Sequence, residues 1–407
     1  MANVSSSNGL EKYPKLRFKG FSEPWTQVLL SDIFKKSTKK NSDGSITNVI
    51  CNSAKNGLIP QKEYFDKSIA NSDNTDGYYI IEQGDFVYNP RKSSDAPYGP
   101  VSIYKYPEHG IVSPLYLCFR ALNPVISSFY NYFFKSPSWH RYVYLSGDSG
   151  ARHDRVSIKD EVFFSMPVNI PTEEEQLKIA SFLGLIEEKI AMQQDLVDNL
   201  KKYKRGAIER MINELTGTCD FSKISSFATC VAGATPDTKK SEYWDNGTIP
   251  WLSSGEVNKK RIYFTDKHIT ALGYQKTSTK MLPVKTVVIA LAGQGKTRGT
   301  VAITETEVCT NQSLAGIITN DTMNSEFLFY YLETQYENLR ILSSGDGTRG
   351  GLNLQLINDF LVPTPSLDKQ KFIAAFGTLL DKQINFNQDL LCQLQSLKSA
   401  LLQQLFA

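Results

Sequence analysis

The stretch from Ala290 to Thr297, Ala-Leu-Ala-Gly-Gln-Gly-Lys-Thr, nearly spells a phosphate-binding P-loop. In a P-loop, the backbone amides of a glycine-rich turn cradle phosphates and a lysine reaches them. Here Ala290 replaces the first glycine and no later strand ending in aspartate stands out, so nucleotide binding is disfavoured. Gln294, Lys296 and Arg298 instead make this turn a candidate for contacts with a DNA phosphate or base edge. A merely solvated turn is the alternative.

Other basic and aromatic side chains could also contact DNA, because arginine can bind guanine bidentately and lysine often meets phosphate as a point charge. These candidates are Arg91, Lys92, Tyr98, Arg152, His153, Arg155, Lys239, Lys240 and Arg349. A Gly…Arg stretch occurs twice in the chain, at 147–152 and at 345–349. Because this feature is repeated, Arg152 and Arg349 are expected to contact backbone phosphate or to brace the following helix. Contacts that read the bases are expected where the two halves of the chain differ in sequence. The clusters 239–240 and 259–261 fit solvated surface as well as they fit DNA contact.

Residues that could catalyse a reaction do not come together in the sequence. The six cysteines and four histidines are scattered, which favours neither a zinc site nor a disulfide framework and indicates reduced thiols. The amino-methyltransferase signature Asn/Asp-Pro-Pro-aromatic is missing, and its nearest match is Asn89-Pro-Arg91. We therefore expect a non-catalytic chain with no metal or cofactor of its own.

The composition is ordinary for a globular protein, with 41% hydrophobic and 21% charged residues. A net charge of +3 is too small to indicate nucleic-acid binding by itself, so a basic surface must come from local clusters. The chain has no apolar run of about 18 residues, and its first residues do not form a secretory signal. We expect a cytoplasmic protein.

An internal duplication organises these residues. The 43 residues from Pro171 align without a gap with those from Pro365, at an offset of 194 and with 12 identities. Shorter matches at similar offsets are Ser146-Gly-Asp with Ser344-Gly-Asp, Gly99–Ile103 with Gly299–Ile303, and Leu30–Ile33 with Ile224–Phe227. The sequence therefore predicts two tandem units, each a globular module followed by a long helix.

Each module is expected to be a mostly-β α+β domain, because β-branched and aromatic runs alternate with Gly, Pro, Asn and Asp. The predicted order is an N-terminal tail at 1–19, a first module at 20–167, a central helical spacer at 168–216, a second module at 217–362 and a C-terminal helical spacer at 363–407. The predicted fold is α+β with pseudo-twofold symmetry.

The two 43-residue segments carry apolar residues at alternating steps of four and three, the heptad seam of a coiled coil. Polar residues interrupt the seam at the same two places in both copies, at Gln193 and Lys204 and at Asn387 and Lys398. A helix of this length spans roughly 60 Å. The predicted helix–helix interface residues are Ile179, Ile186, Ile190, Gln193, Leu200, Ile373, Leu380, Ile384, Asn387 and Leu394.

Chain geometry favours an antiparallel helix pair. The second module joins the C-terminal end of the first helix to the N-terminal end of the second, and these ends lie side by side only in antiparallel helices. Parallel helices would require the module to reach back about 60 Å. We expect one module at each end of the pair, with Gln193 and Asn387 meeting near the pseudo-dyad to fix the register. Exposed polar residues on a loosely packed seam are the alternative.

Two similar modules held apart by a rigid pair of helices would suit binding to two stretches of duplex DNA, whose groove presentation repeats about every 34 Å. Because the modules differ in sequence, the two half-sites should differ as well. The ligand would be an asymmetric, bipartite DNA sequence.

Over nearly its whole length, the chain resembles the specificity subunits of Type I restriction-modification enzymes. Its opening, Pro14-Lys-Leu-Arg-Phe18, Gly20-Phe21 and Trp25, is similar to the family's common start. The segments Gly233-Ala-Thr-Pro236 and Ile249-Pro-Trp251 are similar to the start of many target-recognition domains. Each module ends in a Gly…Arg stretch, at 147–152 and 345–349. The most specific feature is Pro-x-x-x-x-Gln-x-x-Ile, which occurs at 171–179 and again at 365–373.

The resemblance implies that the modules are target-recognition domains and that the helices form the conserved spacer. The chain would direct two methyltransferase (modification) subunits, and optionally motor-nuclease (restriction) subunits, to double-stranded DNA. S-adenosylmethionine would bind the partner methyltransferase. One alternative is a related bipartite system in which methylation and cleavage share one partner chain. The others are a coiled-coil scaffold for protein partners and, least supported, an enzyme.

Overall fold

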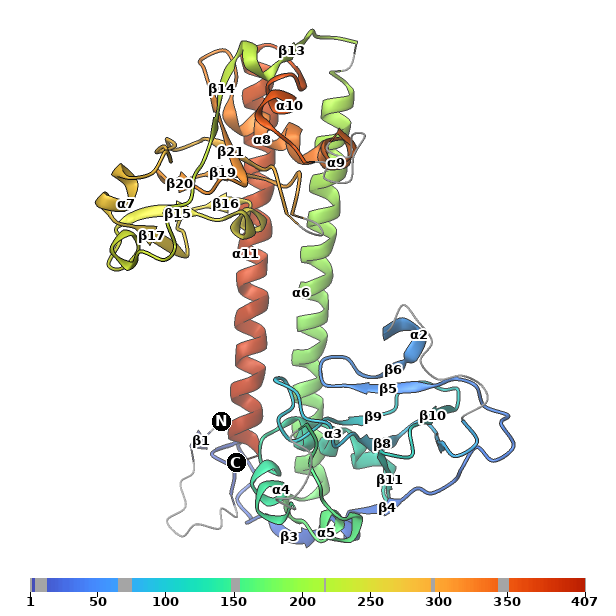
Figure 1. Cartoon of the computed structure of the whole chain (residues 1–407). Helices are drawn as coiled ribbons and strands as arrows, with labels where there is room; N and C mark the ends of the chain where they lie inside the picture. Colours follow the sequence, from blue (N-terminus) through green and yellow to red (C-terminus); the bar gives the residue numbers. More distant parts are fainter. Residues whose placement is uncertain are drawn as a thin grey trace. The chain divides into compact units, whose positions relative to one another are not determined.

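The computed structural model describes residues 2–3, 13–64, 75–147, 154–215, 217–293, 297–342 and 351–406. The chain divides into two compact units, one formed by Met1–Gln193 with Leu390–Ala407 and the other by Gln194–Asp389. Each unit contains one module and parts of two long helices, α6 (Glu173–Asn213) and α11 (Leu367–Leu405) (Figure 1). Neither long helix therefore belongs to one unit alone.

The first module is built on a four-stranded antiparallel sheet of order β4-β11-β8-β9. Its strands are β4 (Phe34–Lys36), β8 (Asp85–Tyr88), β9 (Val101–Ile103) and β11 (Leu117–Ala121). Smaller antiparallel pairs are β1 (Ala2–Asn3) with β2 (Leu16–Arg17), β3 (Thr26–Leu29) with β12 (Pro167–Ile170), β5 (Ile50–Ser53) with β6 (Gly57–Pro60), and β7 (Tyr79–Ile81) with β10 (Gly110–Val112). The helices are α1 (Leu30–Ile33), α2 (Gln61–Tyr64), η2 (Pro124–Ile126), α3 (Ser127–Lys135), α4 (His140–Ser146) and α5 (Asp160–Phe164).

The second module is built on a five-stranded sheet of order β14-β21-β18-β19-β16. Its strands are β14 (Ala228–Ala232), β16 (Arg261–Ile262), β18 (Val287–Ala290), β19 (Val301–Thr304) and β21 (Leu314–Thr319). Beside it lie the pair β13 (Phe221–Lys223) with β22 (Leu361–Pro363) and the three strands β17 (Lys267–Ile269), β15 (Ile249–Leu252) and β20 (Cys309–Thr310). The helices are η3 (Ile224–Ser226), η4 (Ser241–Tyr243), η5 (Ser254–Lys259), α7 (Ala271–Gln275), α8 (Ser325–Thr334), α9 (Tyr336–Leu342) and α10 (Leu354–Asn358).

The shared strand order confirms the predicted duplication. The order β4-β11-β8-β9 of the first module recurs as β14-β21-β18-β19 in the second. In both modules the first and last strands pair, β3 with β12 and β13 with β22, just before the long helix. Gly99 and Gly299, which precede β9 and β19, both have a φ of +82°, a conformation that favours glycine. The second module adds β16, which lies parallel to β19.

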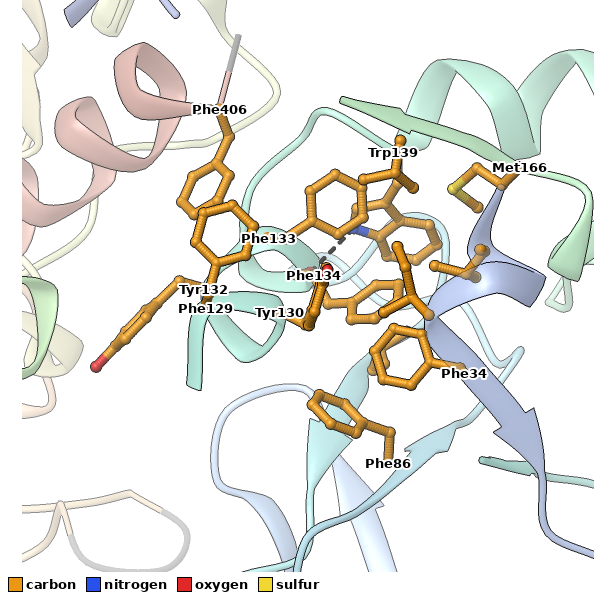
Figure 2. Packing of buried hydrophobic residues seen from close by; sticks show 14 of the residues in the cluster. Phe34, Phe86, Phe129, Tyr130, Tyr132, Phe133, Phe134, Trp139, Met166 and Phe406 are labelled. Atoms are coloured by element: carbon orange, nitrogen blue, oxygen red, sulfur yellow. Dashed lines mark hydrogen bonds between the residues drawn. The ribbon is translucent and has the colours of Figure 1, made fainter. Parts of the chain in front are cut away.

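The core of the first module is completed by the far end of the chain. Phe129 and Phe133 of α3 pack against Phe406, with ring centroids 5.2 and 6.2 Å apart (Figure 2). The Ser138 hydroxyl donates to the Phe406 carbonyl at 2.6 Å. Other residues of the long helices in the same buried cluster are Ile179, Ala180, Leu183, Leu401, Leu402 and Leu405.

The second module is closed in the same way by the opposite helix ends. Ile208 and Ile212, from the end of α6, share its buried cluster with Ile373 and Ala374 from the start of α11. At the offset of 194, these residues correspond to Leu402, Phe406, Ile179 and Ala180 in the first unit. Each module is therefore sealed by the start of the helix that follows it and by the end of the other helix.

The two helices run antiparallel, as the sequence predicts. In the first unit the Lys398 ammonium group of α11 lies 2.6 Å from a carboxylate oxygen of Glu187 in α6. In the second unit Lys204 of α6 lies 2.6 Å from Asp381 of α11. In both units a residue early in one helix thus contacts a residue late in the other.

The ten predicted interface residues are all buried or half-buried. Ile179, Gln193, Ile373, Leu380 and Ile384 are buried, and Ile186, Ile190, Leu200, Asn387 and Leu394 are half-buried. Gln193 and Asn387 fall in different units, so their meeting stays a prediction. Within its own helix, the Asn387 amide donates to the Gln383 carbonyl at 2.8 Å.

Gly377 interrupts the apolar seam of α11 because an aromatic ring occupies the space beside it. A Cβ at this position would lie 2.5 Å from Cε2 of Tyr330 in α8. At Gly184 of α6, by contrast, the nearest atom to such a Cβ is the Tyr132 hydroxyl oxygen at 3.8 Å. The close approach of α8 to α11 therefore requires glycine at 377, whereas α3 leaves room for a side chain at 184.

We predict opposite effects of alanine at these two helical glycines. Gly377→Ala should destabilise the protein by about 1–3 kcal/mol through overpacking. Gly184→Ala should leave the stability unchanged or raise it by up to about 1 kcal/mol through helix propensity. Urea unfolding of both variants measures the difference, and equal effects would contradict the described packing.

Candidate nucleic-acid interface

Two candidate DNA-contacting segments of the first module lie against each other. Arg91 and Arg155 form an antiparallel backbone bridge. The Lys92 amide donates to the Asp154 carbonyl at 2.9 Å, and an equivalent bond of 2.8 Å joins residues 156 and 90. The Arg91 and Lys92 side chains are exposed, and Arg155 is half-buried. We call segments 90–92 and 154–156 the two-loop site of the first module.

The second module pairs the equivalent segments. Its β18 ends at Ala290, and the Leu352 amide just before α10 donates to the Leu291 carbonyl at 3.1 Å. The half-buried Arg298 lies in the same turn, which closes with a bond of 2.9 Å from the Gly299 amide to the Ala290 carbonyl. Segments 291–293, 297–298 and 351–352 therefore form the two-loop site of the second module. Its position after the central strand and before the short helix is the same as in the first.

The other candidate residues differ in their exposure and contacts. Tyr98 is half-buried and packs at a tilt against the His140 ring, with ring centroids 4.8 Å apart, so part of its aromatic surface is already in contact inside the module. Lys239 and Lys240 are exposed, and the Lys240 ammonium lies 3.3 Å from the Tyr243 hydroxyl. The candidates outside the described residues are Arg152, His153, Gln294, Lys296 and Arg349. Their roles stay predictions.

A hollow of about 380 Å³ adjoins the two-loop site of the first module. Pro90 and Arg155 of the two-loop site line it together with Tyr79, Leu115 and Tyr116. Leu115 is 58% exposed, so an apolar side chain stands at its rim. Basic, aromatic and apolar groups therefore share one surface, a combination that can meet both phosphates and base edges.

Arg261 is buried and paired with carboxylates inside the protein. The sequence had favoured solvated surface or DNA contact for the 259–261 cluster. Its side chain is 9% exposed and donates to Glu305 at 2.7 Å and to both carboxylate oxygens of Glu326 at 2.9 and 2.7 Å. Lys260, next to it, lies 3.2 Å from Glu333. The sequence could not predict this burial because the acidic partners are far away in the chain.

The Gln of the repeated Pro-x-x-x-x-Gln motif holds the start of each long helix. Gln176 and Gln370 are buried, and each side-chain amide donates at 2.9 Å to the carbonyl of the proline five residues earlier, Pro171 or Pro365. The motif therefore has a structural role, because its Gln side chain joins the last residues of each module to the first turn of the helix.

Arg17 of the opening segment is buried against the first turn of α6. Its guanidinium donates bidentately to Glu175 at 2.8 and 2.7 Å, and the two side chains are 4% and 0% exposed. Phe18 packs edge-on against Phe182 with ring centroids 5.4 Å apart. Glu175 therefore anchors the opening segment to the helix, a role that the sequence alone did not predict.

A duplicated cluster joins each module to both helices. In the first unit the Tyr132 hydroxyl donates to Glu187 at 3.0 Å, and Lys135 and Lys398 donate to the same carboxylate at 2.8 and 2.6 Å. In the second unit the Tyr330 hydroxyl donates to Asp381 at 2.6 Å, as does Lys204. We call these the Tyr–acid–Lys clusters, and they explain why Lys204 and Lys398 interrupt the seam at equivalent positions.

The clusters keep their charges in the ionised form. Burial by itself would raise the pKa of Glu187, but Lys135 and Lys398 outweigh it and lower this pKa to about 2. Burial would likewise lower the pKa of Lys204, and the carboxylates of Glu333 and Asp381 reverse the direction. Burial and then the adjacent Glu187 raise the pKa of Tyr132, so its hydroxyl remains a donor.

Comparison with known proteins shows which family the second half of the chain matches. Residues 217–396 match the family model of the Type I restriction modification DNA specificity domain. The specificity subunit of the Type I restriction enzyme MjaIX from Methanocaldococcus jannaschii is 30% identical over 181 residues, which are 43% of this chain and 41% of that protein. The EcoR124I/EcoR124II specificity subunit from Escherichia coli is 22% identical over 238 residues, 56% of this chain and 58% of that protein. The chain thus aligns with about half the length of these curated relatives.

A solved structure extends the likeness of fold to the whole chain. The Type I restriction-modification system S subunit from M. genitalium matches with a TM-score of 0.58 at 15% identity, and the match covers 97% of this chain and 99% of that one. The two chains therefore share a fold. Residues 217–396 match the DNA specificity domain of Type I restriction-modification enzymes, the same family that the sequence motifs resemble.

Neither a metal centre nor a membrane-spanning helix occurs among the described residues. They contain no group of three or more His, Cys, Asp or Glu side chains placed to hold a metal ion. In the same part of the chain, no helix combines the length and apolar character needed to cross a membrane.

We predict that Glu187 stabilises the fold in a pH-dependent way. Its folded pKa lies below the usual 4.5, so the stabilisation is fully present above about pH 5 and is lost as the pH falls from 4.5 towards 2. A pKa of about 2 corresponds to roughly 3 kcal/mol at neutral pH. Glu187→Gln should therefore unfold at lower urea concentration than the wild type at pH 7, with a smaller difference at pH 3.

The matched control is Glu188→Gln, because the neighbouring Glu188 is exposed. This variant should follow the wild-type stability at every pH. A deficit of Glu187→Gln that is the same at pH 3 and pH 7 would contradict the assigned pKa.

Proposed function

We propose that this chain is the DNA-recognition subunit of a Type I restriction-modification enzyme and directs partner methyltransferase subunits to a bipartite DNA site. The observation that carries this proposal is the duplicated two-loop site, in which Arg91 and Arg155 are brought together in the first module. Exposed arginine and lysine at paired loops suit contact with phosphates and guanine edges. The match of residues 217–396 to the Type I restriction modification DNA specificity domain supports the same function.

The two half-sites should differ in sequence. The loop after β8 contains Asn89-Pro-Arg-Lys92, whereas the loop after β18 contains Gly293-Gln-Gly-Lys-Thr-Arg298. Because the two loops differ in sequence, each module would select different bases, and the target would be asymmetric. Helices of 41 and 39 residues, each about 60 Å long, would set the spacing between the half-sites.

A row of exposed apolar side chains on each long helix supports docking of two copies of a partner. On α6, Leu185, Met192 and Tyr203 are 63%, 68% and 59% exposed, and they share one face of the helix because their spacings are close to whole turns. Their equivalents on α11 at the offset of 194 are Leu379, Phe386 and Leu397, which are 57%, 67% and 50% exposed. We call these the outer rows, and exposed apolar rows of this kind mark protein-binding surfaces.

Each outer row would bind one methyltransferase subunit, since equivalent surfaces fit identical partners. The catalytic chemistry would then lie in the partners, with S-adenosylmethionine bound there and this chain non-catalytic. Restriction subunits would join such an assembly optionally. A complex that modifies cellular DNA would work in the cytoplasm.

Methylome sequencing tests the proposed function. Cells that express the chain with its methyltransferase should carry methylation at one asymmetric, two-part sequence. Arg91→Ala with Arg155→Ala should lower methylation at that sequence about tenfold or more, because contacts of roughly 1–3 kcal/mol are lost at one half-site. Methylation that needs the methyltransferase alone, or that ignores sequence, would contradict the proposal.

The outer rows can be tested by co-purification. Met192→Asp with Phe386→Asp places charges in the middle of both rows and should sharply reduce the methyltransferase recovered with the chain. The control is Ala191→Asp with Asn385→Asp, which adds the same charges at the exposed neighbouring positions. Equal recovery of methyltransferase with both double variants would exclude the outer rows as the docking surface.

A further inference from the structure

The short helices α4 and α9 are equivalent, and both end in exposed aliphatic side chains. Val143 of α4 and Leu339 of α9 anchor the helices, with exposures of 1% and 0%. Two positions later, Leu145 and Ile341 are 70% and 71% exposed. An aliphatic side chain this exposed, at the same place in both modules, contributes to neither core. We call Leu145 and Ile341 the apolar tips.

In the first module, α4 contacts both of the chain segments that lead to the two-loop site, namely the loop after β8 and the segment before α5. The His140 ring at its start packs at a tilt against Tyr98 of that loop, with ring centroids 4.8 Å apart. At its other end, a Cβ on Gly147 would lie 3.4 Å from the Ser157 carbonyl oxygen, two residues beyond Arg155. The apolar tip at 145 is therefore carried by a helix that contacts the chain segments flanking the two-loop site.

In the second module, α9 has the same neighbour. A Cβ on Gly299 would lie 3.5 Å from side-chain atoms of Leu339 and Arg340. Gly299 lies at the end of the loop that follows β18, as Gly99 lies at the end of the loop that follows β8. The helix that carries the apolar tip at 341 thus packs against the end of the loop that contains Arg298.

The surroundings of the tips favour a polyanion as the ligand. Arg141 of α4 is exposed, and Arg91 and Lys92 lie in the neighbouring loop. In the second module Arg298 and Arg340 occupy the loop and the helix. Cationic groups around an apolar centre match duplex DNA, where charged phosphates flank the apolar sugars and base edges of a groove.

We propose that Leu145 and Ile341 insert into a groove of duplex DNA, one tip at each half-site, and bind it without reading its sequence. The proposal rests on the proposed function and adds a contact that the basic loops do not supply. Because both modules have a tip while their loops differ, the tips serve affinity and the loops serve specificity.

The test uses the full chain in complex with its methyltransferase, and two duplexes, one with the methylated sequence and one with both half-sites scrambled. Leu145→Ser and Ile341→Ser should each weaken binding to both duplexes about tenfold. The slope of log affinity against log salt should stay that of the wild type, because no phosphate contact is lost. Arg91→Ala with Arg155→Ala should instead make this slope shallower.

Leu122→Ser and Val284→Ser are the controls, because these side chains are 60% and 47% exposed at other places in the two modules. They should bind both duplexes as the wild type does. Wild-type affinity of the Leu145→Ser and Ile341→Ser variants would overturn the proposal. Reduced recovery of methyltransferase with these variants in the absence of DNA would also overturn it, since the tips would then be protein contacts. A wild-type complex that binds both duplexes equally would contradict the proposed function instead.

Discussion

Neither module has a complete core until the end of the other helix packs into it. Leu405 and Phe406, in the last turn of the chain, are buried with Phe129 and Phe133 of the first module. Burial of such a side chain is worth roughly 1.5–3 kcal/mol. Ile208 and Ile212 do the same for the second module. The antiparallel helix pair is therefore part of both cores, and each module needs residues from the other half of the chain to complete its own core.

The Tyr–acid–Lys clusters add polar contacts between each module and the two long helices. Both clusters join a module helix to α6 and α11 through one carboxylate. Their fourth members have opposite charge, since Lys135 donates to Glu187 in the first unit and Glu333 pairs with Lys204 in the second. Arg261 of β16, which has no counterpart among the described strands of the first sheet, donates to Asp381 at 3.4 Å. Each helix segment therefore has charges that match those of its own module.

The sequence predicted the duplication, the long helices and their antiparallel direction, because apolar periodicity and a repeat offset are visible without coordinates. It also grouped Arg91, Lys92 and Arg155 as candidates, although only the fold brings them together. It did not predict the burial of Arg261 or the pairing of Arg17 with Glu175. Their partners are distant in the chain, and charged side chains are usually exposed, so the sequence favoured exposure for both arginines. Lys204 and Lys398, which interrupt the apolar seam at equivalent positions, were the feature of the sequence that pointed to the Tyr–acid–Lys clusters.

The same architecture links folding to recognition, since the helices that connect the modules also complete them. Hydrogen exchange of a Leu401→Ala, Leu405→Ala, Phe406→Ala variant tests this dependence most directly. The account predicts that amide protection falls in β8, β11 and α3 of the first module, far away in sequence, while β18 and β21 of the second module keep theirs. Protection lost mainly in the second module, or unchanged in both, would contradict it.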